Sequence, residues 1–97
     1  MKITDPGKCN ISKAKLAEME KFFREKYIEN GKLAGIQTLV ARKGKIVHFK
    51  STGYRDIENK KKIEKNTIFR IYSMTKPVTS VALMQLFEQG LFQLADP

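Results

Sequence analysis

Residues 68–90 read IFRIYSMTKPVTSVALMQLFEQG. This segment contains the most specific pattern in the chain for predicting both its fold and its chemistry. From Met74 onward the pattern predicts a helix that is apolar on almost every side, and such a helix is expected to be buried. Gly90 stands where a C-terminal cap belongs. Ser73 lies at or just before the first turn and Lys76 follows three residues later, so their side chains are expected on one face.

A serine hydroxyl beside a lysine amine at a helix start is the arrangement of an amine-activated nucleophile. The hydroxyl attacks well only after a base removes its proton, and a lysine whose pKa is lowered by burial or by neighbouring cations can be that base. The helix start adds unpaired N–H groups and the positive end of the helix dipole. Ser73 and Lys76 are therefore the candidate catalytic residues, and the backbone N–H of Ser73 is a candidate oxyanion donor.

The bare Ser-x-x-Lys spacing is weak in a chain with this much lysine. It occurs a second time as Ser12-Lys13-Ala14-Lys15, which opens a polar helix and is interpreted as an N-cap followed by solvated lysines. Ser73 differs in its context, because a strand-like apolar run precedes it and an apolar helix follows it. A serine that merely caps its helix is the alternative interpretation of Ser73.

The sequence IFRIYSMTKP at residues 68–77, the apolar helix that ends in EQG, and LADP at residues 94–97 resemble the serine β-lactamase-related family. The match is to its class C β-lactamase-like branch, which includes β-lactamase-fold esterases and D-alanyl-D-alanine peptidases, and it covers about residues 33–97. In that family the serine is acylated by the substrate carbonyl, and the lysine of the motif helps to deprotonate it. The resemblance assigns these roles to Ser73 and Lys76.

The remaining segments predict one helix and one hairpin. Ser12–Asn30 has the pattern of an amphipathic packing helix that Gly31 ends; its apolar side carries Leu16, Met19, Phe23 and Tyr27, with Phe22 beside them. Gly35–Arg42 and Lys45–Gly53 are rich in β-branched and aromatic residues, and Lys43-Gly44 between them predicts a tight turn. Tyr54–Asn66 is polar and predicts a surface connection with a short extended piece at Lys62-Ile63.

The expected fold class is therefore α+β: an N-terminal helix, an antiparallel β-hairpin and a buried central helix. By resemblance this is the N-terminal part of a β-lactamase-like (penicillin-binding-like) α/β sandwich. Residues 1–97 are expected to form one partial domain. Its parts would be the tail and helix (1–32), the hairpin (33–55), the connection (56–72), and the Ser-x-x-Lys helix with its following loop (73–97).

Two motifs that the family needs do not occur after Lys76: a Tyr-x-Asn or Ser-x-Asn, and a Lys-Thr-Gly or His-x-Gly. Since family members run to several hundred residues, the chain is interpreted as the N-terminal quarter of such an enzyme, as a fragment or a truncated reading frame. The expected function is that of the N-terminal portion of a serine hydrolase, which forms an acyl-enzyme with ester or amide (β-lactam-like) substrates. The alternative is an inactive truncated remnant that serves only as a binding or assembly piece.

The charge balance does not change this interpretation. Lys and Arg number 19 against 10 acidic residues, a formal charge of +9, which suggests nucleic acid or an anionic membrane. The excess lies within residues 1–66, is scattered, and accompanies no recognised nucleic-acid motif, so a solvated basic surface is expected. The expected partners are a small-molecule ester or β-lactam-like substrate and, through the apolar helix, a second copy of the chain, but no nucleic acid.

The single cysteine, Cys9, and the single histidine, His48, can form neither an internal disulfide nor a zinc site, and no cofactor is expected. A lone strand histidine is usually structural or solvent-facing, and a general base is the alternative for His48. The N-terminal sequence MKITDPGKCNIS lacks the apolar core of a signal peptide, and no run approaches the ~18 apolar residues of a membrane span. A cytoplasmic location is expected.

Overall fold

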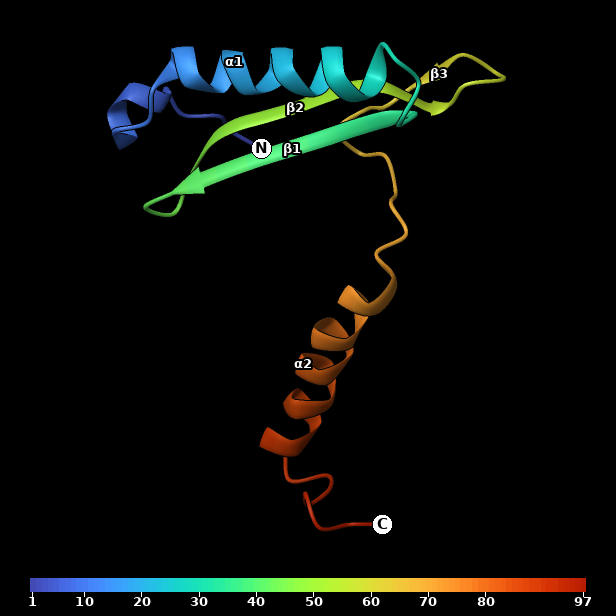
Figure 1. Cartoon of the computed structure of the whole chain (residues 1–97). Helices are drawn as coiled ribbons and strands as arrows, with labels where there is room; N and C mark the ends of the chain where they lie inside the picture. Colours follow the sequence, from blue (N-terminus) through green and yellow to red (C-terminus); the bar gives the residue numbers. More distant parts are fainter. The chain divides into compact units, whose positions relative to one another are not determined.

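The computed structural model describes residues 1–97 (Figure 1). The chain forms two compact units, Met1–Thr67 and Ile68–Pro97. The first unit holds a helix and a three-stranded antiparallel sheet in the order β1-β2-β3, and the second unit holds one α-helix. The predicted α+β class is confirmed.

The N-terminal helix begins where the sequence supplies a cap. α1 spans Lys13–Phe23, and Ser12 Oγ accepts a hydrogen bond from the backbone N–H of Lys15 at 3.3 Å. The helix continues as a π-helical turn over Arg24–Ile28, and Gly31 follows with φ 74°, a left-handed conformation that glycine adopts without strain. Its partly buried side chains are Leu16, Met19, Glu20, Phe23, Tyr27 and Ile28. The packing helix predicted for this region is confirmed.

The two predicted strands form the hairpin. β1 (Gly35–Arg42) pairs antiparallel with β2 (Lys45–Asp56), with Gly35 opposite Gly53 at the open end. Lys43 and Gly44 both have positive φ, 52° and 71°, as a two-residue turn of type I′ requires. β2 is longer than predicted because its last residues pair with the short strand β3 (Lys61–Lys62).

The core of the first unit is centred on β2. The buried residues of the unit are Val47, His48 and Phe49 on β2, together with Cys9 and Ile63. α1 runs along one face of the hairpin (Figure 1). Phe49 is covered by the segment after β3, where the ammonium of Lys65 lies 5.8 Å from the ring centre of Phe49. β2 is thus the central strand of this unit.

His48 joins three elements. Its side chain is 5% exposed, Nδ1 lies 3.4 Å from Oε1 of Glu20 on α1, and Nε2 lies 2.8 Å from Oγ1 of Thr38 on β1. The Glu20 carboxylate lies within ion-pair distance of Nδ1, and Nε2 is hydrogen-bonded to the Thr38 hydroxyl. The histidine is a structural link between the helix and the hairpin.

We expect His48→Ala to lower the free energy of unfolding by about 2–3 kcal/mol, because it opens a cavity and leaves two partly buried polar groups without their partner. Urea unfolding followed by far-UV circular dichroism measures the change. Lys50→Ala, an exposed site on the same strand, is the matched control. A His48→Ala effect no larger than that of the control would contradict the link.

Asp56 ends β2 and holds the turn to β3. The side-chain amide of Asn59 donates to its carboxylate at 2.7 Å and the backbone N–H of Asn59 at 3.1 Å, and these bonds lower the pKa of Asp56 from its ordinary 3.8. A depressed folded-state pKa stabilises the fold above pH 3.8, and this contribution disappears as the pH falls through the folded-state pKa. We therefore expect Asp56→Ala to lower the urea midpoint at pH 7, and we expect this deficit to shrink progressively as the pH falls below 3.8. A deficit that stays the same at every pH would contradict the assignment.

The second unit is built on α2 (Thr75–Glu88), which follows a 3₁₀ turn over Tyr72–Met74. Gln89 caps it and Gly90 follows with φ 73°, as predicted. The burial predicted for this helix is not found: no residue of α2 is buried, and Val78 and Val81 are 65% and 62% exposed. The physical reason is that an apolar helix needs a second packed layer, and this unit contains no other α-helix or strand. None of the helices is both long and apolar enough to cross a lipid bilayer.

Candidate functional site

Ser73 and Lys76 lie at the start of α2. Ser73 is the central residue of the 3₁₀ turn, and Lys76 is the second residue of the helix. The 3₁₀ turn leads directly into α2, so a spacing of three residues places the two side chains about one turn apart. Both are exposed.

The hydroxyl of Ser73 and the amine of Lys76 are not hydrogen-bonded to each other. The only side-chain hydrogen bond within residues 68–97 runs from the backbone N–H of Gln93 to Asp96. Catalytic hydrogen bonds are often long in ligand-free structures and shorten when substrate binds, so this geometry is compatible with a serine–lysine pair. Both side chains are exposed and make no side-chain hydrogen bond that would have to break before they contact a substrate.

Tyr72, directly before the serine, has φ 47°, the left-handed region that side-chain-bearing residues avoid. The turn is held by Met74, whose N–H donates to the carbonyl of Ile71 at 3.0 Å, and by Thr75, whose N–H donates to the carbonyls of Tyr72 and Ser73. Strained backbone of this kind gathers at functional sites, where it fixes the direction of a reactive side chain. No feature of the sequence pointed to Tyr72.

The second Ser-x-x-Lys copy is structural. Ser12 Oγ accepts the N–H of Lys15, and the Lys15 ammonium pairs with Glu18 at 2.8 Å. The hydroxyl is thus used as a helix cap, and the lysine is held in an exposed ion pair on the same helix. The predicted N-cap is confirmed, and the two copies differ in their surroundings as the sequence indicated.

A hydroxyl, an imidazole and a carboxylate lie next to one another in the first unit, as they do in nucleophilic triads. They belong to Thr38, His48 and Glu20. Here the imidazole is buried and the threonine is partly buried in the hairpin. A substrate carbonyl must reach the nucleophilic oxygen, and the burial of Thr38 and His48 prevents that contact. The trio therefore acts in packing.

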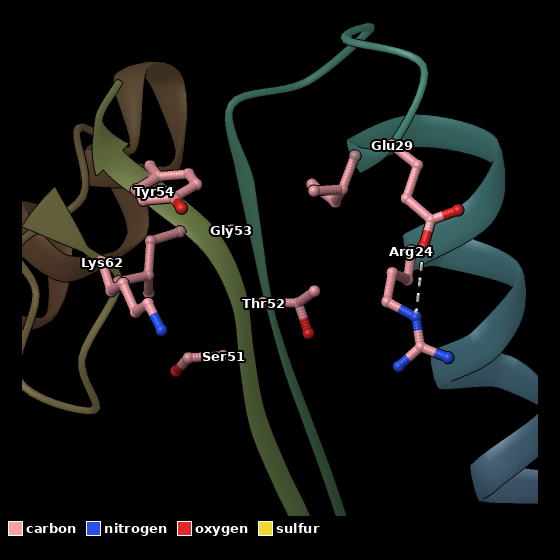
Figure 2. Close-up of a pocket in the computed structure, with 9 residues that line it drawn as sticks. Arg24, Glu29, Ser51, Thr52, Gly53, Tyr54 and Lys62 are labelled. Carbon is pink, nitrogen blue, oxygen red and sulfur yellow. Dashed lines mark ion pairs between the residues drawn. The ribbon is translucent and has the colours of Figure 1, made fainter. Parts of the chain in front are cut away.

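A cavity of about 380 Å³ lies within the first unit, between the end of the helix and the second half of β2 (Figure 2). Arg24 Nε lies 3.7 Å from Glu29 Oε1 on one side, and Ser51, Thr52 and Lys62 line the other. The hydroxyl of Ser51 already accepts a hydrogen bond from Gln37 Nε2 at 3.0 Å, and no histidine lines the cavity. All residues that line this cavity belong to the first unit.

Among the described residues, no group of three or more His, Cys, Asp or Glu side chains is placed to hold a metal ion. The family model described as Beta-lactamase matches residues 19–97. The chain belongs to the beta-lactamase family. The resemblance inferred from residues 68–77 is confirmed, and the match begins earlier, inside α1.

Individual proteins from several bacteria are similar to this chain at moderate identity. Protein Rv1367c of Mycobacterium tuberculosis is 43% identical over 67 residues, which cover 69% of this chain and 17% of the relative. Esterase EstB of Burkholderia gladioli is 29% identical over 93 residues, covering 96% of this chain and 24% of the relative. Protein flp of Staphylococcus aureus is 32% identical over 69 residues, or 71% of this chain and 14% of the relative. The chain thus spans a quarter or less of the length of these curated relatives.

Proposed function

We propose that this chain is the N-terminal portion of a serine hydrolase that forms an acyl-enzyme with small ester or amide substrates, including β-lactam-like ones. Ser73 is the nucleophile, Lys76 is the base, and the backbone N–H of Ser73 is one oxyanion donor. The observation that supports the proposal is the position of Ser73 in a chain of the beta-lactamase family. Ser73 directly follows the strained Tyr72, and it lies in the 3₁₀ turn before α2, about one turn before Lys76. The similarity to a protein named an esterase supports ester substrates.

The first step of the proposed reaction is the acylation of Ser73 by the substrate. The neutral amine of Lys76 takes the hydroxyl proton of Ser73 while the serine oxygen bonds to the substrate carbonyl carbon. The carbonyl oxygen becomes an oxyanion near the positive end of α2, whose first turn carries no acidic side chain that would oppose this charge. The bond to the leaving group breaks, the leaving group takes the proton back from Lys76, and water later releases the acyl group.

A fluorophosphonate probe tests the proposal, because it phosphonylates activated serines and not ordinary surface hydroxyls. The 97-residue chain is expected to show saturable labelling that a short-chain ester slows by competition. The far-UV spectrum of the same sample shows whether the helix and hairpin are folded. A folded chain that takes up no probe would leave the family membership in place and remove the catalytic assignment.

Three finer assignments accompany the proposal. Residues 1–97 are proposed to belong to one partial beta-lactamase-related domain, with the internal divisions at residues 32, 55 and 72 predicted from the sequence. Its proposed partner is a small molecule and not nucleic acid, because the excess of basic residues is scattered over residues 1–66 and accompanies no recognised nucleic-acid motif. A cytoplasmic location is proposed, because a single cysteine can form no internal disulfide and a reducing compartment fits it.

The second candidate function is an inactive piece that associates with another chain, and the surface of α2 favours it. Exposed apolar side chains occur all around this helix: Val78, Val81, Leu83, Met84, Leu86 and Phe87 are 36–65% exposed. A monomer seldom exposes a continuous apolar patch of this kind without a partner. Self-association is the simplest way for this chain to cover it.

We expect sedimentation of the chain to show concentration-dependent association that Leu83→Lys weakens about tenfold or more, because the ammonium cannot be buried in an apolar contact. Gln85→Lys is the matched control, since it adds the same charge to the same exposed helix without removing an apolar side chain. A monomer at every concentration, or equal effects of the two variants, would contradict association through α2.

A further inference from the structure

A second cavity of the first unit lies between the N-terminal segment, α1 and β2, and has a volume of about 330 Å³. We call it the α1–β2 groove. Its lining is mainly apolar, and the apolar residues are Ile3, Pro6, Leu16, Ala17, Val47 and Phe49. The N-terminal wall is held in place, because the N–H of Thr4 donates to the carbonyl of Ile46 at 2.8 Å and Cys9 is buried. The groove is therefore part of the fold.

Four charged or titratable side chains complete the lining: Glu20, His48, Lys13 and Lys50. Glu20 and His48 pair with each other, and His48 also has its contact with Thr38, so neither needs a ligand as a partner. Lys13 and Lys50 are exposed, and neither occurs in the four ion pairs of the chain. Two unpaired ammonium groups border an apolar cavity.

This combination points to a ligand with an apolar body and one anionic end. We propose that the α1–β2 groove binds a medium-chain aliphatic carboxylate, whose chain covers the apolar lining while its carboxylate meets Lys13 and Lys50. The volume is at the lower end of the roughly 300–1,000 Å³ of small-molecule sites, which suits a single short aliphatic chain. Each added methylene that fits should tighten binding roughly fourfold.

Binding can be followed by NMR through His48, which lines the groove. It is the only histidine of the chain, so its imidazole resonances do not overlap with those of another histidine. The 97-residue chain is titrated with sodium octanoate below its micellar concentration. We expect a saturable shift of the His48 signals, a roughly 16-fold weaker effect of hexanoate, and much weaker binding of octanamide, which has no charge. Equal responses to octanoate and octanamide would remove the role of the lysines.

Two kinds of variant locate the site. Lys13→Ala and Lys50→Ala should each weaken octanoate binding several-fold, while Lys15→Ala, whose ammonium pairs with Glu18, should not. Ala17→Leu fills the groove and should weaken binding at least tenfold; if it does not fold, the two lysine variants still decide. Octanoate that perturbs α2 resonances without a saturable shift of His48, or that binds Ala17→Leu as tightly as the parent chain, would overturn the proposal in favour of adsorption elsewhere.

Discussion

Ser73→Ala is expected to lower the rate of fluorophosphonate labelling by about 10³-fold or more, because it removes the oxygen that forms the covalent bond. Loss of a catalytic nucleophile in complete serine hydrolases costs more than this, and here the residual reaction of surface hydroxyls sets the lower limit. Lys76→Ala should lower the rate by about 10²–10³-fold, the usual contribution of a general base. Labelling rates under pseudo-first-order conditions measure both effects.

The chain contains its own matched control. Ser12→Ala and Lys15→Ala change a serine and a lysine with the same spacing, at a helix start where the hydroxyl is a cap and the amine is in an ion pair. Both variants should label at the parent rate. If Ser12→Ala reduced labelling as much as Ser73→Ala, the two copies would be equivalent and the reactivity of Ser73 would not come from its position.

Gly53→Ala is expected to destabilise the first unit by about 3 kcal/mol or more, which corresponds to a fall in melting temperature of roughly 12–24 °C. Gly53 has φ 88°, where a side chain is strained. Its added Cβ would collide with the carbonyl oxygen of Ala34 and lie 2.8 Å from Cα of Gly35, and both are backbone atoms that cannot rotate away. Thermal unfolding followed by circular dichroism measures the loss.

Gly31→Ala separates strain from crowding. Gly31 has a similar φ of 74°, but no heavy atom lies within 4 Å of the Cβ that a substitution would add. Only the conformational cost of about 1 kcal/mol is expected there. Equal losses for Gly31→Ala and Gly53→Ala would show that the close approach of the strands at Gly35 and Gly53 does not govern stability.

Local elements could be predicted from the sequence, because their signals lie within a few residues. Ser12 and Gly31 bracket the first helix, Lys43-Gly44 adopts the turn that its composition predicts, and Gly90 follows α2. These features need no knowledge of the rest of the chain. The family was likewise readable from the ten residues around Ser73, because they combine a motif with its strand and helix context.

Non-local features escaped prediction. The N–H of Thr4 donates to the carbonyl of Ile46, and Cys9 is buried although its neighbours in the sequence do not indicate burial. His48 was identified only as a lone strand histidine, because its partners Glu20 and Thr38 are far away in the sequence. The positive φ of Tyr72 has no sequence signal, since aromatic residues do not favour that conformation. The exposure of α2 depends on which other segments are present to cover it.

The site of covalent attachment tests the account most directly. The chain is labelled with the fluorophosphonate, digested with trypsin and analysed by tandem mass spectrometry, which assigns the added mass to one side chain. We predict that the adduct lies on Ser73, with the peptide of Ser12 unmodified. An adduct on Ser12, Ser51 or Ser80 instead, or no adduct at all in a chain whose helix and hairpin are folded, would contradict the claim that Ser73 is an activated nucleophile.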